Sequence, residues 1–217
     1  MFQSMPDIRI MVLNYKRPEN VHKIIKAYRD QYPITVINNN PTEPFPYIGQ
    51  PVDVINNNKN YYCMERWIRC FDYPEDYKLI LDDDMLIDPH TILRMRKKRQ
   101  NIVGIYGKTN VSKASCYEDL KDNWCIDAEN DFLVGSAILV RQEGLNKIQS
   151  ELEKIGYPRR GDDIIVSYLL KKHLKCPMKT VSAKVLNLPE GNVGLNKDPS
   201  HFSMRWKVVE KFKNLTW

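Results

Sequence analysis

Residues 77–85 read Tyr-Lys-Leu-Ile-Leu-Asp-Asp-Asp-Met, and the expected fold class follows from this stretch. Its first five residues form a largely apolar run typical of a buried strand, and Asp82, Asp83 and Asp84 follow without a break. Like charges this close repel one another unless a cation or a proton compensates them. In open α/β sheets, ligands bind at the carboxyl ends of the strands. The stretch therefore predicts a parallel α/β sheet with its ligand site at this strand end.

The triple aspartate also indicates what kind of ligand to expect. In an extended backbone, Asp82 and Asp84 point to one side and Asp83 to the other. Carboxylate oxygens suit Mn²⁺ or Mg²⁺, and such metals keep open coordination positions for substrate phosphates. We therefore expect a metal or a nucleotide here, with Asp84 and Asp82 as the metal-binding pair. The alternative is an exposed acidic turn that caps the helix beginning near residue 89.

Strands alternate with helices along the rest of the chain. The pattern predicts one domain over residues 1–217 with a mostly parallel, Rossmann-like sheet, helices on both faces and a short antiparallel element. Residues 41–51 are rich in proline and are expected to form a surface loop, and residues 106–131 are irregular. Strands are predicted at 8–13, 34–37, 52–55, 77–81, 102–105, 132–140 and 181–186, and helices at 17–30, 59–71, 89–99, 142–155, 161–173 and from about 200.

Composition narrows the class of protein. The chain has 217 residues, 42% hydrophobic and 28% charged, which is enough apolar material for a core and too little bias for disorder. It has no apolar run near the roughly 20 residues that span a bilayer and no signal peptide, so a cytoplasmic protein is expected. The five cysteines form no C-x-x-C pair and fit a reduced compartment. The net charge of +6 favours phosphate-bearing partners mildly.

A second acidic pair stands at a predicted helix entrance, in the sequence Gly161-Asp162-Asp163-Ile164. One carboxylate is enough to cap a helix, and Asp162 is assigned that role. Asp163 is then available to receive an acceptor hydroxyl proton or to stabilise a positive sugar centre. A plain helix cap remains the alternative for Asp163.

Basic and aromatic residues offer two interpretations. Arg17 follows the first strand and Arg66 precedes the aspartate strand, so both are placed to meet phosphate. In the predicted helix 59–71, Tyr62, Arg66 and Arg69 would share the polar face. The interleaving of aromatic and basic side chains also suits a nucleotide- or RNA-binding module without turnover. The basic cluster at 94–99 is interpreted as a solvated helix end, where cations complement the helix dipole.

Taken in chain order, these segments resemble the motifs of the GT-A glycosyltransferases, and most closely those of the exostosin-like family. The resemblance runs from about Ile8 to Leu215. It implies a Mn²⁺-dependent retaining enzyme that transfers a hexose from a UDP-sugar to a glycan or another hydroxyl acceptor. The segments are Asn-Tyr-Lys-Arg at 14–17, Asn-Asn at 38–39, Arg66, the triple aspartate, Val-Gly-Ser-Ala at 134–137, Gly-Asp-Asp-Ile at 161–164 and His-x-x-x-Arg at 201–205.

The resemblance implies a role for each matched residue. Those expected around the uracil and ribose are Leu13, Tyr15 and Arg17, assisted by Asn38 or Asn39. Asp82 would contact the ribose or sugar, Asp84 would bind the metal, and Asp83 would sit between them. Arg66 would approach the donor sugar and its phosphate, and Arg205 would bind the diphosphate. Gly135, Ser136 and Ala137 would shape the acceptor pocket, and Asp163 would lie near the anomeric carbon, so the catalytic set is Asp163, Arg66 and Arg205.

The sequence also departs from that family. A second arginine expected shortly before Arg66 is absent, because residues 60–63 read Asn-Tyr-Tyr-Cys. Family members that build heparan chains enter the secretory pathway, whereas this sequence begins without a secretory signal, so a different acceptor in a microbial or viral pathway is expected, in the host cytoplasm if viral. A sugar-nucleotide-forming transferase is disfavoured, because residues 14–17 do not supply a glycine-rich first loop.

Overall fold

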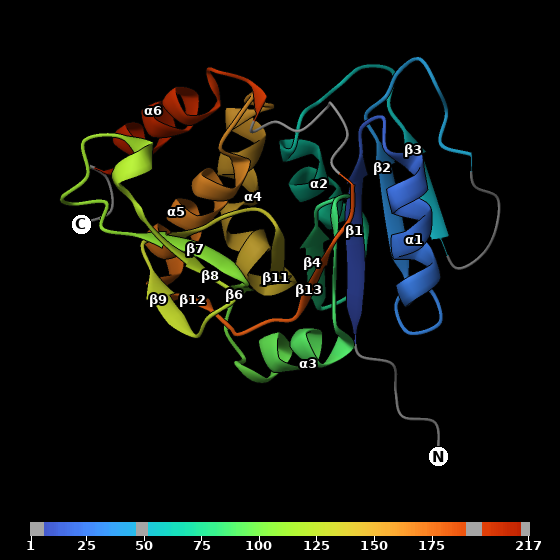
Figure 1. Ribbon diagram of the computed structural model, residues 1–217, viewed down its shortest axis with the longest axis horizontal. Coiled ribbons are helices and arrows are strands. Elements are labelled where there is room, and N and C mark those ends of the chain that lie inside the picture. The colour runs from blue at the N-terminus through green and yellow to red at the C-terminus, as the bar shows by residue number, and fades with distance from the viewer. Residues whose placement is uncertain (1–6, 47–51, 190–196, 214–217) are drawn as a thin grey trace.

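The computed structural model describes residues 7–46, 52–189 and 197–213, which fold around an eight-stranded sheet (Figure 1). The strand order is β3-β2-β1-β4-β11-β6-β12-β9, and β11 and β9 run antiparallel to their neighbours. The bounds are β1 Ile8–Asn14, β2 Ile34–Asn38, β3 Val52–Asn56, β4 Tyr77–Leu81, β6 Ile102–Gly104, β9 Ala128–Asn130, β11 Ala137–Arg141 and β12 Met178–Thr180.

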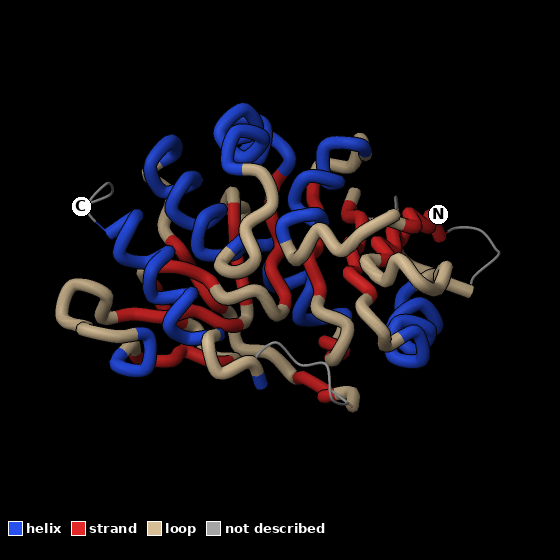
Figure 2. Tube along the Cα trace, turned by 90° about the horizontal axis from the view of Figure 1, so that it is seen from above, coloured by secondary structure: helices blue, strands red, loops and turns tan. Residues whose placement is uncertain are grey.

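Helices cover both faces of this sheet, as the view along its edge shows (Figure 2). One face packs on α1 and α3 through buried residues such as Ile24 and Ile92. The other packs on α2, α4 and α5 through residues such as Trp67 and Ile148. The helices are α1 Pro18–Tyr28, α2 Met64–Ile68, α3 Pro89–Lys97, α4 Gln142–Ile155, α5 Asp162–Leu174 and α6 His201–Lys213, with 3₁₀ turns at Arg69–Asp72 and Tyr117–Asp119.

Two small antiparallel sheets flank the large one. The first has the order β10-β7-β8, formed by β10 (Phe132–Leu133), β7 (Tyr106–Thr109) and β8 (Lys121–Trp124). The second pairs β5 (Met85–Ile87) with β13 (Val185–Asn187). Across the three described ranges, no helix is long and apolar enough to cross a bilayer.

The predicted α/β fold class is confirmed, whereas several element boundaries were wrong. The helix expected at 59–71 begins only at Met64. The strand expected at 132–140 is broken between β10 and β11, and the one expected at 181–186 is replaced by β12 and β13. The irregular stretch 106–131 contains β7, β8 and β9, which are too short for their periodicity to register. The predicted loop 41–51 lies within the described residues only through residue 46.

Asparagines close the carboxyl ends of the first three strands. Asn14, Asn38 and Asn56 occupy matched positions in β1, β2 and β3. The Asn14 amide donates to Asn38 Oδ1 at 2.8 Å, and the Asn38 amide donates to Asn56 Oδ1 at 2.9 Å. Because buried amides must be paired, this ladder fixes the strand ends from which the loops around the site depart.

Candidate functional site

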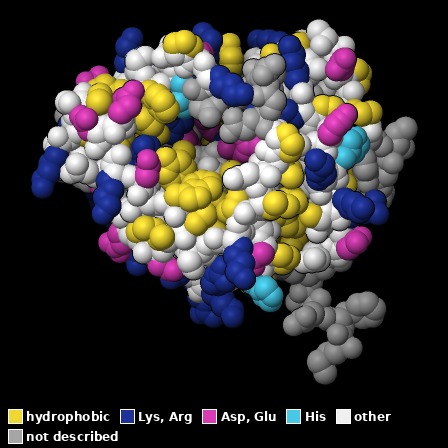
Figure 3. Space-filling model, in the orientation of Figure 1, with side chains coloured by type: hydrophobic (Ala, Val, Ile, Leu, Met, Phe, Trp, Pro, Cys, Tyr) yellow, Lys and Arg dark blue, Asp and Glu magenta, His cyan; other side chains and the backbone are white. Residues whose placement is uncertain are grey.

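A cavity of about 930 Å³ opens at the carboxyl ends of β1 and β4. Acidic side chains lie within the hollow at the centre of the face drawn in Figure 3. One wall is built from residues that follow β1 and β4, and the facing walls come from β7, β8, the 134–136 turn and the starts of α5 and α6. The lining includes these residues predicted from sequence: Leu13, Tyr15, Arg17, Arg66, Asp82, Asp83, Asp84, Gly135, Ser136, Asp163 and Arg205.

Arginines hold the triple aspartate at the end of β4. Arg17 Nη1 lies 2.6 Å from Asp83 Oδ1 and 3.3 Å from Asp84 Oδ2, and Arg66 pairs with Asp82. Burial raises the pKa of Asp82 to about 7, against the opposing charge of Arg66 and with a further rise from Asp84. Burial likewise raises the pKa of Asp83 to about 6, against the charge of Arg17. The two arginines therefore compensate the acidic cluster only in part.

Arg66 is the central cation of the site. Its side chain is 3% exposed and bridges Asp82 with Asp162, whose Oδ2 lies 3.6 Å from Arg66 Nη2. The expected polar face of Tyr62, Arg66 and Arg69 was therefore wrong, because Arg66 is buried between two carboxylates that compensate its charge. Tyr62 lies before the helix with φ of 58°, held by a bond from its N–H to Asn60 Oδ1.

The two aspartates at the start of α5 do not act as helix caps. Gly161 is the N-cap residue, and Asp162 Oδ2 instead accepts a hydrogen bond from Trp67 Nε1 at 2.7 Å. The assignment of Asp162 as a cap was therefore wrong. Asp163 Oδ2 accepts from Arg205 Nη2 at 2.8 Å and from the Gly135 N–H at 2.7 Å. Both carboxylates thus make tertiary contacts at the cavity wall, and Asp163 Oδ1 in addition accepts from the first-turn N–H of Ile164 at 2.9 Å.

Asp163 and Arg205 form a buried ion pair, 3% and 8% exposed. Burial alone would raise the pKa of Asp163, but the charge of Arg205 and hydrogen bonds from Arg205, Gly135 and Ile164 hold that pKa below its ordinary value. Arg205 Nε also donates to Tyr117 Oη at 2.8 Å. The pair therefore stays ionised at neutral pH and presents a fixed charge arrangement to the cavity.

The 134–136 turn brings a glycine between these groups. A Cβ on Gly135 would lie 2.7 Å from Arg66 Nη2 and 3.5 Å from Asp163 Oδ2, so a larger residue here would displace the guanidinium from its position beside Asp82 and Asp162. Ser136 also lines the cavity, and its carbonyl accepts from the Asp82 N–H at 2.9 Å. Ala137 is fully buried in β11 and packs in the core, away from the cavity.

Asn38 and Asn39 lie behind the cavity rather than on its surface. Asn38 belongs to the asparagine ladder. The Asn39 amide donates to the Tyr62 carbonyl at 2.9 Å, and Asn39 Oδ1 accepts from Asn57 at 2.8 Å. Because Tyr62 lines the cavity, Asn39 supports the site through that loop.

The wall of the cavity that β7 and β8 build was not predicted from the sequence. Tyr106 stands opposite Trp124 and Lys108 opposite Asp122, and all four side chains line the cavity. Lys108 Nζ lies 2.8 Å from Asp122 Oδ1, and the Tyr106 and Trp124 rings meet edge to face at 5.1 Å between centroids. The available signal was the alternation of these residues with Gly107 and Asn123, which face the other way.

The donor set at the end of β4 fits a hard divalent cation. Asp82 and Asp84 both line the open cavity, and burial, more than repulsion between the carboxylates, raises the pKa values of Asp82 and Asp83. Over the described ranges, no cluster of three or more His, Cys, Asp or Glu side chains could enclose a metal alone. Two carboxylates beside open space match a cation whose other ligands come from a bound phosphate and water.

Comparison with known proteins places the fold. No protein-family model matches the sequence, and no curated protein matches it. The inositol-1-phosphate CTP transferase from T. maritima shares 11% identity over 98% of each chain, with a TM-score of 0.50. The glycosyltransferase GlyE of Streptococcus pneumoniae TIGR4 shares 13% over 80% of this chain and 44% of that one, with a TM-score of 0.43. Protein A197 from STIV shares 15% over 84% and 86%, with a TM-score of 0.44. This chain is thus similar in fold to a nucleotide transferase, which agrees with the GT-A-type α/β architecture.

Proposed function

We propose that the protein is a metal-dependent glycosyltransferase that moves a hexose from a UDP-sugar to a hydroxyl acceptor. The observation that carries the proposal is a single cavity in which the triple aspartate of β4 and the Asp163–Arg205 ion pair both lie, with Arg66 linking Asp82 to Asp162. One end of the cavity is suited to a cation and a diphosphate, and the other to a sugar that develops positive charge. The motif resemblance to exostosin-like enzymes supports the UDP-sugar donor and retention of configuration.

The proposed role of each residue follows from the charge of its side chain. Asp84 and Asp82 would hold Mn²⁺ or Mg²⁺, which would neutralise the diphosphate leaving group. Arg205, held in place by Asp163, supplies a second, fixed positive charge, and a preorganised charge of this kind stabilises a leaving group. Asp163, ionised and immobilised by three donors, stabilises positive charge at the anomeric carbon or orients the acceptor hydroxyl.

The β7–β8 wall supports a hydroxyl-bearing acceptor. Trp124 is 40% exposed at the cavity, where its ring can stack on the face of a sugar. Asp122 and Lys108 beside it supply an acceptor and a donor of hydrogen bonds. Together with Gly135 and Ser136 they form the proposed acceptor side.

The fold likeness to a CTP transferase favours a second candidate, nucleotidyl transfer to a sugar phosphate or polyol phosphate. In that reaction the cavity would bind a nucleoside triphosphate and release pyrophosphate, whereas the glycosyltransferase reaction releases UDP. The first loop argues against this candidate, because residues 14–17 read Asn-Tyr-Lys-Arg and supply no glycine-rich sequence for a triphosphate.

The test is a product assay with both substrate classes. Purified protein is given UDP-glucose, UDP-galactose, UDP-N-acetylglucosamine or GDP-mannose, with Mn²⁺ or with EDTA, and released UDP or GDP is measured. CTP or UTP with hexose 1-phosphates forms the second arm, in which pyrophosphate is measured. UDP release that needs Mn²⁺ supports the first proposal, and pyrophosphate release supports the second.

The aspartate assignment has its own control. Asp84→Ala should abolish Mn²⁺-dependent UDP binding in calorimetry while the protein still unfolds cooperatively. Asp127→Ala removes a carboxylate that is 60% exposed outside the cavity and should bind as wild type does. A donor at a hundred times its dissociation constant should also stabilise the wild type by about 2.7 kcal/mol. Equal metal affinity in both variants would contradict the assignment.

A further inference from the structure

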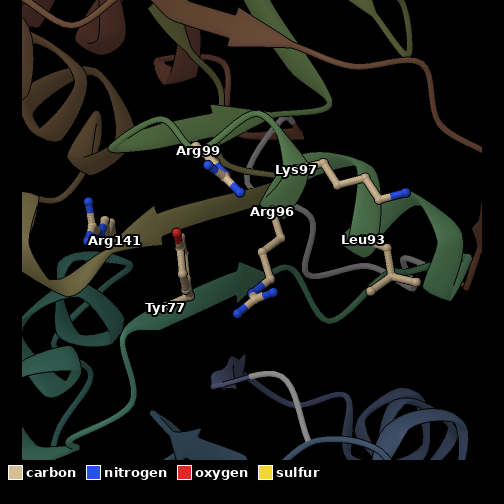
Figure 4. A pocket seen from close by; sticks show the side chains of 6 residues that line it. All are labelled: Tyr77, Leu93, Arg96, Lys97, Arg99 and Arg141. Carbon is tan, nitrogen blue, oxygen red and sulfur yellow. The ribbon is translucent and has the colours of Figure 1, made fainter. Parts of the chain in front are cut away.

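A second hollow, of about 420 Å³, lies at the opposite end of β4 from the triple aspartate (Figure 4). Tyr77 begins β4 and Leu81 ends it, so the hollow stands about 13 Å along the strand from the main cavity. Four of its lining residues are cations, and of the described residues that line it none is acidic. They are Tyr77, Leu93, Arg96, Lys97, Arg99 and Arg141.

The basic cluster at 94–99 sorts by its contacts into two groups. Arg94 donates to Thr91 Oγ1 and to the Ser182 carbonyl, and Lys98 pairs with Asp127 at 3.2 Å. Neither of these two lines the hollow. Arg96, Lys97 and Arg99 do line it, and among the residues that the structure describes none of the three is paired with a carboxylate. The cations left uncompensated are therefore those that face the hollow.

The helix dipole does not explain this arrangement. Cations in the last turn of α3 complement its negative end, but Arg141 comes from β11, where it stands directly opposite Tyr77. Arg141 has an exposed partner in Glu143 at 3.1 Å, a surface pair of the kind that contributes little. Cations from a helix, a loop and a strand thus line one hollow.

Arg99 occupies a backbone conformation that favours another residue. Its φ is 51°, directly after the C-cap Lys98 of α3, where glycine or asparagine is the usual choice. An arginine at this position is under local backbone strain, and its guanidinium lines the hollow. Figure 4 shows Arg96 and Tyr77 projecting into the same space, and Arg96 Cζ lies 5.6 Å from the Tyr77 ring centroid.

We infer that this hollow binds a phosphate-bearing ligand, separate from the nucleotide-sugar cavity. Guanidinium groups bind phosphate through paired hydrogen bonds. The hollow has three guanidinium groups and one lysine, which together carry more positive charge than a singly charged anion would neutralise. The Tyr77 ring and the 40% exposed Leu93 offer an apolar surface to whatever carries the phosphate. The same chemistry is presented by a free phosphate compound and by an anionic lipid headgroup.

The experiment measures binding of two probes at physiological ionic strength, where weak surface attraction is screened. Inorganic pyrophosphate is titrated without divalent metal by calorimetry, and co-sedimentation is measured with phosphatidylcholine vesicles with and without phosphatidylglycerol. Binding of pyrophosphate alone identifies a free phosphate compound, and sedimentation that needs phosphatidylglycerol identifies a lipid headgroup. Absence of both overturns the inference.

Matched variants locate the binding. The double variant Arg96→Gln/Arg99→Gln should weaken it at least tenfold, whereas the double variant Lys98→Gln/Lys113→Gln, with the same charge change outside the hollow, should bind within twofold of wild type. Arg99→Gly separates binding from folding, because glycine suits the backbone there, so binding should fall while the melting temperature does not. Equal losses in both double variants, or full binding by Arg99→Gly, would overturn the inference.

Discussion

The two ends of β4 handle charge in opposite ways. At the carboxyl end, all five arginines that line the cavity pair with carboxylates, in the contacts Arg17–Asp83, Arg66–Asp82, Arg205–Asp163, Arg159–Asp198 and Arg160–Asp198. At the amino end, Arg96, Lys97 and Arg99 face a hollow without acidic lining residues in the described ranges. The charges at the carboxyl end are thus already paired within the protein, whereas those at the amino end would be paired by the ligand inferred above.

This difference has an energetic meaning. Buried charges need partners, so breaking a pair at the carboxyl end leaves an uncompensated ion inside the protein. Exposed cations at the amino end keep their water, so losing one costs little stability. Substitutions at the two ends should therefore separate folding from binding.

Arg66→Met should give the largest effect. It leaves Asp82 and Asp162 without their shared cation, and breaking a buried pair of this kind typically costs about 3–5 kcal/mol. The free energy of unfolding is measured in urea. Arg96→Met removes the same group at the other end and should change stability by no more than about 1 kcal/mol, the value of its contact with Tyr77. Equal losses would remove the contrast between the two ends.

The burial of Arg66 also marks the limit of prediction from sequence. Strand ends are local features, so the apolar run at 77–81 and the aspartates after it could be placed without a structure. The partners of Arg66 come from the end of β4 and the start of α5, and no local pattern shows that they meet. A charged residue without visible partners is naturally assigned to the surface.

The cavity wall formed by β7 and β8 was not predicted from the sequence, for a different reason. Each strand has four residues, and their polar alternation resembles a loop unless the pairing is known. By contrast, Arg205 and Asp163 were named as site residues from the motif resemblance, and the structure brings them into contact at 2.8 Å. Their catalytic roles stay predictions.

Asp163→Asn should lower turnover by at least about a hundredfold, equivalent to about 2.7 kcal/mol. The shape is kept, while the charge beside the proposed anomeric position is lost. Arg205 would also lose its ionised partner, so some destabilisation is expected as well. Turnover of the folded protein is compared with that of Asp131→Asn, a part-buried carboxylate that accepts from the Val111 N–H at 2.9 Å and does not line the cavity, and that should keep turnover within about threefold. Similar turnover in the two variants would return Asp163 to a structural role.

Trp124→Ala should raise the KM for a carbohydrate acceptor about tenfold, the equivalent of roughly 1.4 kcal/mol, because the stacking surface is lost. The dissociation constant for UDP, bound on the opposite wall, should stay unchanged. Tyr157→Ala removes another ring that is 40% exposed but does not line the cavity, and it serves as the control. If the acceptor KM is unaffected by Trp124→Ala, then β8 does not form the acceptor side.

Asp88→Ala should give the smallest effect, about 1 kcal/mol at neutral pH, because Asp88 is the N-cap of α3 and accepts from the Thr91 N–H at 3.1 Å. Burial would raise the pKa of Asp88, but the Thr91 hydrogen bonds outweigh it and lower that pKa. The charged cap therefore stabilises the protein fully above the unfolded pKa of about 3.9, and its contribution is lost as the pH falls through the lower folded value. Asp88→Asn keeps the cap without the titration, so its stability should stay near that of wild type at pH 7 and lose the pH-dependent part. Because α3 carries the basic hollow and not the aspartate cluster, Asp88→Ala should weaken pyrophosphate binding before it affects UDP binding, and the reverse order would show that the two ends of β4 are not independent.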